Sequence, residues 1–284
     1  MSVFKKIVKK TGRVVFFSLL LGLVLTSCAS NNSSAGRTEE KQPLVLYVVR
    51  HGQSVFNLMD RVQGISDAIL TERGMQGAIN MGIGLRDINF RSVYASDLAR
   101  AYRTAALAME QNRATQNWTV IQMPELREVS FGIFEGDPNY MMYYAFGKDL
   151  GLNIPEDARD IYSASAPILE QFDNSFMRFF EELANFNKRV DTEFRVSESA
   201  DEVYARLKKG IDTIIAENPN GGNIMLVAHG QSINFLFRIL NVDTAGAPLG
   251  NSSVTKIKYE NGVFSVDGPI GDMSYVEAGA ELGR

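Results

Sequence analysis

Strand-like apolar runs alternate with amphipathic stretches through most of the chain, and this alternation limits the possible folds more than any other feature. The apolar runs span residues 44–49, 92–95, 119–123 and 223–228, and helical stretches span residues 72–86, 98–110 and 201–217. Parallel strands need long crossover connections, which are usually helices. The sequence therefore predicts a single α/β domain with a mostly parallel central sheet and helices on both faces.

Two regions depart from this alternation. Near the C-terminus, residues 253–259 and 263–266 flank Glu260-Asn261-Gly262, and this pattern predicts a β-hairpin. Residues 137–197 are rich in aromatic residues and methionine, and part of this segment has helical spacing. We interpret it as a helical insertion that packs on the domain. A compatible hypothesis is a cap whose aromatic face helps to select the substrate.

The composition excludes several classes of protein and site. With 45% hydrophobic and 22% charged residues, the 284-residue chain is neither disordered nor collagen-like. From Leu44 onward it has about 240 residues, which suits one hydrophobic core. Only 2 His and 1 Cys are present, which excludes an internal disulfide and a zinc site built on Cys or several His. We expect no metal and no cofactor.

The N-terminal segment resembles a targeting signal. Five basic residues up to Arg13 precede an apolar run over residues 14–25, and small residues follow it. This run is short for a membrane-spanning helix, although an uncleaved membrane anchor is an alternative. Because residues 1–27 contribute five basic residues and no acidic one to the net charge of −4, the rest carries −9. An acidic body argues against nucleic-acid binding.

The sequence Leu25-Thr26-Ser27-Cys28 resembles the bacterial lipobox. The resemblance implies that residues 1–27 are a signal peptide, that cleavage occurs before Cys28, and that this cysteine carries lipid. Several acyl chains hold a protein firmly at a membrane surface. Residues 28–43 lack apolar periodicity and are expected to be a flexible tether. We therefore expect an extracytoplasmic lipoprotein of the bacterial cell envelope, with the folded domain spanning residues 44–284.

Both histidines follow predicted strands, and each precedes a glycine. Arg50-His51-Gly52 comes after the run 44–49, and His229-Gly230 comes after the run 223–228. In open α/β sheets, sites lie beyond the carboxyl ends of the strands. A histidine that attacks phosphorus needs nearby cations or N–H donors to neutralise the phosphoryl oxygens, and an adjacent arginine supplies such charge. We therefore expect one phosphate-binding pocket that contains both histidines.

The motifs around these residues occur in the order found in a known family. They resemble the histidine phosphatase superfamily, in its phosphoglycerate-mutase-like branch, over roughly residues 44–276. The motifs are Arg50-His-Gly-Gln-Ser-Val-Phe-Asn57, Leu70-Thr-Glu-Arg-Gly74, Tyr94-Ala-Ser-Asp-Leu-Ala-Arg-Ala-Tyr-Arg-Thr-Ala105, Leu126-Arg-Glu-Val-Ser-Phe-Gly-Ile-Phe-Glu-Gly136, Val227-Ala-His-Gly-Gln-Ser232 and Asn251-Ser-Ser-Val-Thr255.

The resemblance implies a role for each matching residue. His51 matches the nucleophile that becomes phosphohistidine, and Glu128 matches the acid. The phosphate-binding positions are matched by Arg50, Arg100 and His229, with Asn57 as a neutral contributor. The residues alone leave the acid open, because Glu125 and Glu135 are close to Glu128 in the sequence. One departure concerns the element before the helical stretch 201–217, where Ser197 stands in place of glycine before Glu198-Ser199.

These observations favour a metal-independent phosphomonoester hydrolase that acts on a small phosphorylated substrate outside the cytoplasm. A phosphoglycerate mutase is the first alternative. Secretion argues against it, because a mutase's substrate and its primer are cytoplasmic metabolites. A non-enzymatic lipoprotein that binds a phosphorylated ligand is the second alternative. Such a protein has no need of a nucleophile and an acid together.

Overall fold

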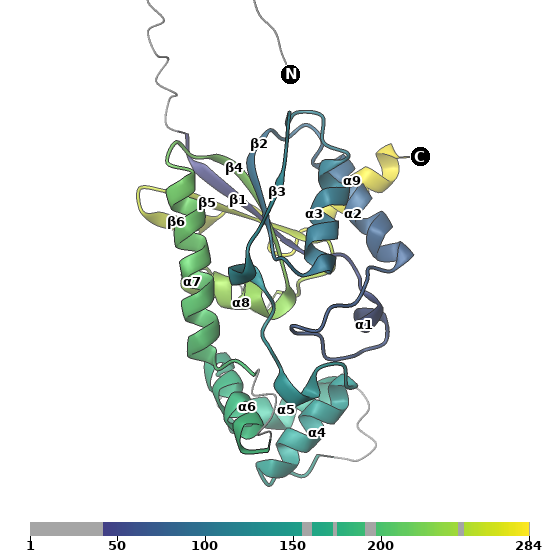
Figure 1. Ribbon diagram of the computed structural model, residues 1–284, viewed down its shortest axis with the longest axis vertical. Coiled ribbons are helices and arrows are strands. Elements are labelled where there is room, and N and C mark those ends of the chain that lie inside the picture. Colours follow the sequence, from purple (N-terminus) through teal and green to yellow (C-terminus); the bar gives the residue numbers. More distant parts are fainter. Residues whose placement is uncertain (1–41, 155–160, 173–174, 191–196, 244–246, 284) are drawn as a thin grey trace, which may run out of the picture. The chain divides into compact units, whose positions relative to one another are not determined.

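A six-stranded sheet forms the centre of the fold. The computed structural model describes residues 42–154, 161–172, 175–190, 197–243 and 247–283. The strand order is β3-β2-β4-β1-β5-β6 (Figure 1). Its strands are β1 (Leu44–Arg50), β2 (Phe90–Ala95), β3 (Val120–Gln122), β4 (Gly222–Ala228), β5 (Val254–Glu260) and β6 (Val263–Val266). Strands β3, β2, β4 and β1 are parallel, whereas β5 is antiparallel to β1 and to β6.

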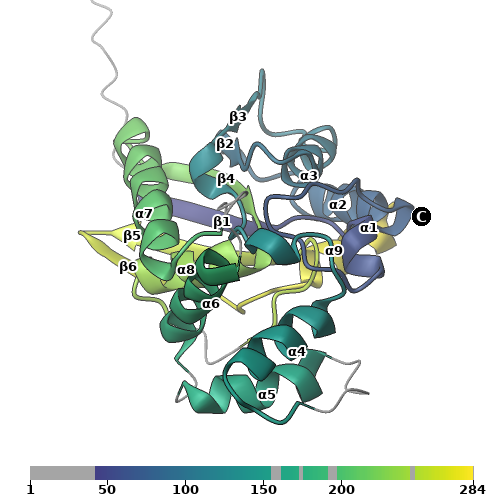
Figure 2. The same cartoon turned by 60° about the horizontal axis from the view of Figure 1, so that its bottom comes forward.

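Helices cover both faces of this sheet, which confirms the predicted fold class. One face is covered by α2 (Glu72–Gly84), α3 (Ala99–Met109) and α9 (Ser274–Leu282), and the other by α7 (Ala200–Glu217) and α8 (Gly230–Ile239) (Figures 1 and 2). Alternate residues of β1 enter the two cores: Leu46 and Val48 face α7 and α8, whereas Tyr47 and Val49 face α2 and α3. Strand β1 is therefore buried on both sides, as its uninterrupted apolar sequence predicts.

The predicted elements begin and end within two residues of the observed ones. The predicted hairpin corresponds to β5 and β6, which are paired antiparallel. Helix α7 begins one residue earlier than predicted because the Ser199 side chain accepts a hydrogen bond from the Glu202 backbone N–H, while the Glu202 side chain accepts one from Ser199. This reciprocal cap satisfies two N–H groups at the helix start.

Helices α1 (Val55–Leu58), α8 and α9 were not predicted. In α8, consecutive residues Phe235, Leu236 and Phe237 are all buried. The helix nevertheless has a polar side, because Gln231, Asn234 and Arg238 recur at spacings of three and four and are less buried. A helical period was therefore present in the sequence. Its apolar residues occupy adjacent positions because α8 packs both against the sheet and against neighbouring helices.

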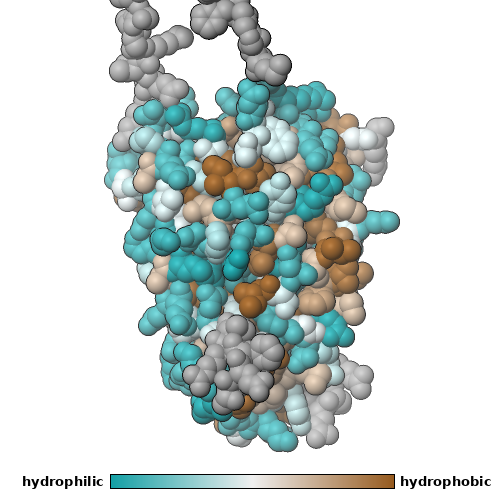
Figure 3. Space-filling view, viewed as in Figure 1, coloured by the Kyte–Doolittle hydropathy of each residue, from teal (hydrophilic) through white to brown (hydrophobic). Residues whose placement is uncertain are grey.

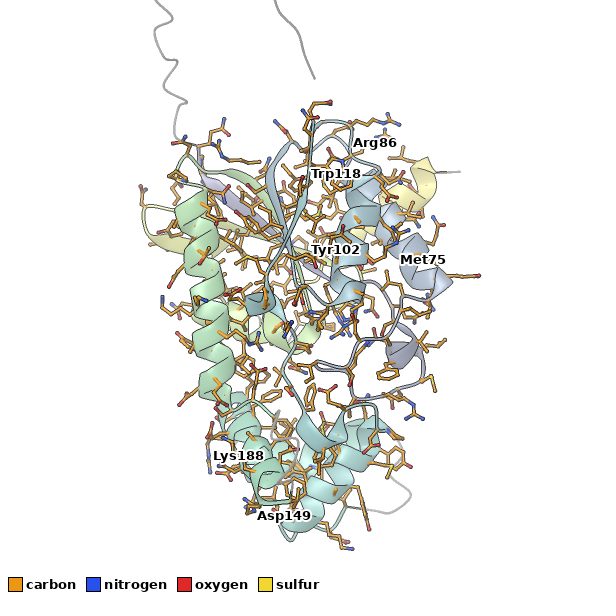
Figure 4. All side chains as sticks on the ribbon, in the orientation of Figure 1. Met75, Arg86, Tyr102, Trp118, Asp149 and Lys188 are labelled. Atoms are coloured by element: carbon orange, nitrogen blue, oxygen red, sulfur yellow. The ribbon has the colours of Figure 1, made fainter. Side chains whose placement is uncertain are left out.

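The segment 137–197 contains three helices in its described part. They are α4 (Asn139–Asp149), α5 (Ile161–Gln171) and α6 (Phe176–Val190). Their buried aromatic side chains belong to the same core as α7 and α8. An ion pair of 2.5 Å between Asp149 and Arg189 joins the ends of α4 and α6, and Figure 4 shows Asp149 at the end of α4 away from the sheet. The face seen in Figure 3 is mostly hydrophilic, with small and separate apolar areas.

The N-terminal boundary of the fold lies slightly before the predicted one. Gln42 and Pro43, which we assigned to the tether, already hydrogen-bond to the turn before β4: the Gln42 N–H donates to Asn220 and the Pro43 carbonyl accepts from Gly222. The predicted signal peptide, Cys28 and the tether up to residue 41 lie outside the described residues. Within the described part, none of the helices is both long and apolar enough to cross a membrane.

Candidate active site

The two histidines lie side by side at the carboxyl end of the sheet. Strands β1 and β4 are adjacent and parallel, and Arg50 is opposite Ala228 at their last paired position. His51 and His229 therefore emerge together, with ring centroids 5.1 Å apart and ring planes inclined by 56°. Both side chains are buried. The structure thus brings together the two histidines that the sequence places 178 positions apart.

The hydrogen bond of His51 determines which ring nitrogen carries the proton. Its Nδ1 lies 2.8 Å from the carbonyl oxygen of Gly52. Because a carbonyl oxygen only accepts hydrogen bonds, Nδ1 is the protonated nitrogen of the neutral ring and Nε2 keeps its lone pair. Burial lowers the pKa of His51 well below its usual value, and the charges of Arg100 and Arg50 lower it further. His51 is therefore neutral, with an unprotonated Nε2 able to act as a nucleophile.

The loop that carries His51 is held from two sides. On one side, the Gly52 N–H donates to Thr104 Oγ1 at 2.9 Å. On the other, Asn251 Nδ2 donates to the His51 carbonyl at 3.0 Å and to Asn57 Oδ1 at 3.2 Å. Thr104 and Asn251 both belong to the motifs quoted above, but neither was assigned a role. Nothing in the sequence shows that this threonine and this asparagine converge on one loop.

A glycine at position 52 is needed because another backbone lies very close. A Cβ atom at this position would stand 2.6 Å from the carbonyl oxygen of Gly74, near the start of α2. Real Cβ contacts are not this short, so any larger residue would push apart the loop and the helix. Gly52 therefore allows His51 to be supported on a firmly packed turn.

The two arginines keep unused hydrogen-bonding capacity close to His51. Arg50 Nη1 donates to the Leu249 carbonyl at 2.6 Å. Arg100 Nη2 donates to the Gly64 carbonyl at 2.7 Å, and its Nη1 also donates to the loop that follows. Within the described residues, neither Nε of these arginines nor either ring nitrogen of His229 has a partner, although all four atoms are buried. Unpaired buried polar atoms are uncommon, and these are suited to bind an anion.

Glu128 is a buried carboxyl group at the start of α8. Its Oε1 accepts from the Ser232 N–H at 2.7 Å, and its Oε2 accepts from the Gln231 N–H at 3.0 Å. Burial raises the pKa of Glu128 above its usual value, although these backbone hydrogen bonds act in the opposite direction. A Cβ atom at Gly230 would lie 3.6 Å from Arg50 Nε and 3.8 Å from Glu128 Oε2, so both groups approach the same glycine.

The other two candidate acids have different surroundings. Glu125 forms an ion pair of 2.8 Å with Lys209, and the lysine side chain is exposed. Glu135 is bound to backbone: its carboxylate accepts from the N–H groups of three consecutive residues at 3.0–3.1 Å, and these residues are Gly64, Ile65 and Ser66. The carbonyl oxygens of this same loop hold Arg100. Glu135 thus organises the loop that positions an arginine.

A cavity of about 400 Å³ opens beside this group of residues. Its lining includes the polar residues Arg50, His51, Asn57 and Glu128. It also includes aromatic side chains from the segment 137–197 and from residue 131. Arg100 and His229 do not line the cavity, and they are only 1% and 0% exposed. Among the described residues, no three His, Cys, Asp or Glu side chains are grouped so as to hold a metal ion.

The sequence and the fold match known proteins. The model of the histidine phosphatase superfamily (branch 1) matches residues 46–184 and 169–269. The chain belongs to the histidine phosphatase superfamily. The crystal structure of phosphoglycerate mutase from Bacillus anthracis str. Sterne is 34% identical, with a TM-score of 0.73 over 86% of this chain and 100% of that chain. The probable phosphoglycerate mutase GpmB of Erwinia tasmaniensis is 26% identical over 82% of this chain and 95% of the relative. Mycobacterial glucosyl-3-phosphoglycerate phosphatase shares the fold at 22% identity, with a TM-score of 0.57 over 81% of this chain and 100% of that chain.

In this histidine phosphatase superfamily member, Arg206 of α7 holds the segment that carries Glu128. Its Nε and Nη2 each donate to the carboxylate of Glu198 at 2.7 Å. Its Nη1 also donates to the carbonyl oxygens of Glu125 and Arg127 at 2.9 Å. A planar guanidinium provides these donors in a fixed arrangement that an ammonium group cannot reproduce. Arg206 is therefore a positioning residue for the Glu128 segment.

Replacing Arg206 with alanine is expected to lower the free energy of unfolding by about 1–3 kcal/mol, because a charged carboxylate and two carbonyls lose their donors. Urea unfolding measures this change. Lys208→Ala is the matched control on the same helix, because Lys208 forms only an exposed pair with Asp212. The control should leave the unfolding midpoint unchanged. Equal midpoints for Arg206→Ala and wild type would show that the segment is held by other contacts.

Proposed function

We propose that this histidine phosphatase superfamily member is a phosphomonoester hydrolase that forms a phosphohistidine at His51. The observation that supports this most is the convergence of unpaired buried nitrogens around His51, from Arg50, Arg100 and His229. A phosphoryl group bound at His51 would give a partner to the two arginine Nε atoms and to one ring nitrogen of His229. The guanidinium groups would offset the charge that develops on the phosphoryl oxygens, which is the larger part of catalysis in phosphoryl transfer.

The first step transfers the phosphoryl group to the enzyme. His51 Nε2 attacks phosphorus, and the P–N bond forms as the P–O bond to the alcohol breaks. Glu128 gives its proton to the departing alkoxide, and the raised pKa of this buried carboxyl keeps the proton available. In the second step Glu128 takes a proton from water, the resulting hydroxide attacks phosphorus, and orthophosphate leaves. His51 returns to its neutral form.

A phosphoglycerate mutase is the alternative, because relatives of this chain carry that name. A mutase must hold a substrate that bears a carboxylate as well as a phosphate. Besides Arg50 and His51, Arg61 is the only basic side chain among the described residues that line the cavity. It is a single arginine, and one of its donors, Nη1, is bonded to the Gly136 carbonyl at 2.5 Å. The aromatic lining gives a carboxylate little compensation for lost hydration. Hydrolysis therefore suits the cavity better.

The experiment incubates the purified full chain with 4-nitrophenyl phosphate and with 3-phosphoglycerate, each with and without EDTA. Phosphate release that EDTA does not reduce is the expected result, since the proposed mechanism uses arginine charges in place of a metal. Isomerisation of 3-phosphoglycerate without phosphate release would establish a mutase. Turnover of neither substrate would favour a protein that only binds a phosphorylated ligand.

We further propose that the protein is extracytoplasmic and is attached to a membrane through lipid on Cys28. This proposal rests on the basic and apolar N-terminal pattern and on the lipobox-like sequence at residues 25–28. Multiple acyl chains would hold the protein at the membrane, whereas a single chain gives only marginal binding.

The Cys28→Ser variant is expected to leave the membrane fraction or to remain unprocessed in the membrane, because it lacks the thiol that accepts lipid. Metabolic labelling with a radioactive fatty acid and intact-protein mass spectrometry check this result. Ser33→Ala, also within the predicted tether, is the control and should keep the label and the mature mass. Unchanged label and mass in Cys28→Ser would overturn the lipid anchor.

A further inference from the structure

The cavity that His51 lines also has an aromatic wall, which we define as Phe131, Tyr143, Phe176, Phe179 and Phe180. Phe131, Phe179 and Phe180 are buried, whereas Tyr143 and Phe176 are partly exposed. The wall comes from one loop and from two helices of the segment 137–197. The cavity therefore combines the groups assigned to phosphate with an apolar wall.

The aromatic wall is packed from behind and does not need a ligand to hold its shape. The ring of Phe176 lies 4.9 Å from that of Phe180, and both rings contact Phe235 of α8, at 4.7 and 5.4 Å between centroids. The guanidinium carbon of Arg238 stands 4.2 Å from the centre of the Phe176 ring. Such edge-to-face pairs and cation contacts restrain ring motion. A preformed wall binds an apolar group without a large ordering cost.

Few charged groups line this cavity apart from those assigned to the phosphoryl group. Burial raises the pKa of Tyr143 to about 12, so its hydroxyl stays neutral at physiological pH. The remaining polar lining residues in the described part are uncharged amides, namely Gln63, Asn139, Gln231 and Asn234 together with Asn57. A second anionic group on a ligand would meet only one further basic side chain among the described lining residues, Arg61, whose Nη1 is bonded to the Gly136 carbonyl. The cavity thus suits a ligand whose phosphate is its only charge.

We propose that the aromatic wall selects phosphomonoesters of apolar alcohols, those with a hydrocarbon chain or an aromatic ring, over esters of sugars, glycerol or hydroxy acids. This inference rests on the proposed function, because it assumes that the phosphoryl group binds at His51. The apolar part of the alcohol then reaches Phe176 and Tyr143. Each methylene buried against the wall should raise kcat/KM about three- to four-fold.

The test compares ethyl, butyl and hexyl phosphate with glycerol 3-phosphate. These esters share an unactivated primary alkoxide leaving group, so differences in kcat/KM report mainly on contacts with the alcohol. The expected kcat/KM ratio of hexyl to ethyl phosphate is on the order of 100, and glycerol 3-phosphate should be no better than ethyl phosphate. An equal rate for all chain lengths, or a preference for glycerol 3-phosphate, overturns the inference.

The Phe176→Ala variant links the selectivity to the wall. It should reduce the hexyl-to-ethyl ratio of kcat/KM at least ten-fold, because contacts with the longer chain are lost and phosphate contacts remain. Phe264→Ala is the matched control: this partly exposed ring on β6 pairs with Tyr259 on β5 and does not line the cavity. A ratio unchanged in Phe176→Ala overturns the assignment of selectivity to this wall.

A binding measurement separates failure of this inference from failure of the proposed function. Hexylphosphonate and ethylphosphonate cannot be hydrolysed at the P–C bond, and calorimetry reports their affinities without turnover. Tighter binding of hexylphosphonate supports the wall even if no ester is hydrolysed, in which case only the proposed hydrolysis fails. Equal affinities overturn the inference whether or not the esters are hydrolysed.

Discussion

Replacing His51 with alanine is expected to lower kcat for phosphate release by roughly 10⁴-fold or more, the size of effect seen when a catalytic nucleophile is removed. The reason is that the variant has no atom in place of Nε2 to accept the phosphoryl group. Steady-state assays measure the loss of rate. Acid-labile, alkali-stable labelling of the protein by a ³²P-labelled ester detects the phosphohistidine directly and should be absent in the variant.

Peptide mapping of this label provides the control. The chain has only two histidines, so the label must fall on a peptide that contains either His51 or His229. A His229→Asn variant should still become labelled at His51, although more slowly, because it retains the nucleophile and loses a phosphate partner. Label on the peptide that contains His229, or full activity in His51→Ala, would contradict the proposed mechanism.

The Glu128→Gln variant is expected to lose kcat/KM by about 10²–10³-fold for an alkyl phosphate and much less for 4-nitrophenyl phosphate. An alkoxide needs a proton to leave, whereas 4-nitrophenolate is stable without one. The pH profile gives a second measurement. Burial raises the pKa of Glu128, so the carboxyl stays protonated to higher pH, and alkyl ester hydrolysis should fall as pH rises through this pKa. The Gln variant should lack this decline.

Two further variants distinguish the three carboxyl groups. Glu125→Gln should change kcat/KM for the alkyl phosphate and for 4-nitrophenyl phosphate by no more than about two-fold. The reason is that the Glu125 side chain forms a surface pair with Lys209. Glu135→Gln weakens the loop that holds Arg100, so it should slow both substrates by a similar factor. Glu135→Gln could instead slow the alkyl phosphate much more than 4-nitrophenyl phosphate, with no such difference in Glu128→Gln. That result would show that Glu135 is the acid and that the assignment to Glu128 is wrong.

Much of the fold follows from local sequence patterns. Val48 and Val49 belong to an apolar run with no polar interruption, and this pattern indicates a strand buried on both faces. Helix α3 was predicted although residues 104–109 are all buried. Helix α8 was missed although Gln231, Asn234 and Arg238 mark a polar side at helical spacing, so its pattern could have been recognised.

The active site could be predicted only in part, because its final geometry depends on contacts between distant segments. The position of the two histidines followed from their places after strands. The choice among Glu125, Glu128 and Glu135 did not, since these residues lie in a segment with two short 3₁₀ turns, at 124–126 and 132–134, that gives no periodic signal. What separates them is the long-range partner of each, which is α8 for Glu128 and the loop 64–66 for Glu135.

The path of β1 has a consequence for access to the cavity. The strand has seven residues, and Leu44 and His51 lie at its opposite ends, about 20 Å apart at the usual rise per residue. Gln42 is already hydrogen-bonded at the Leu44 end. If Cys28 carries lipid as proposed, the chain enters the fold at the end of β1 opposite to His51. An anchor before Gln42 would therefore leave the residues that line the cavity undisturbed.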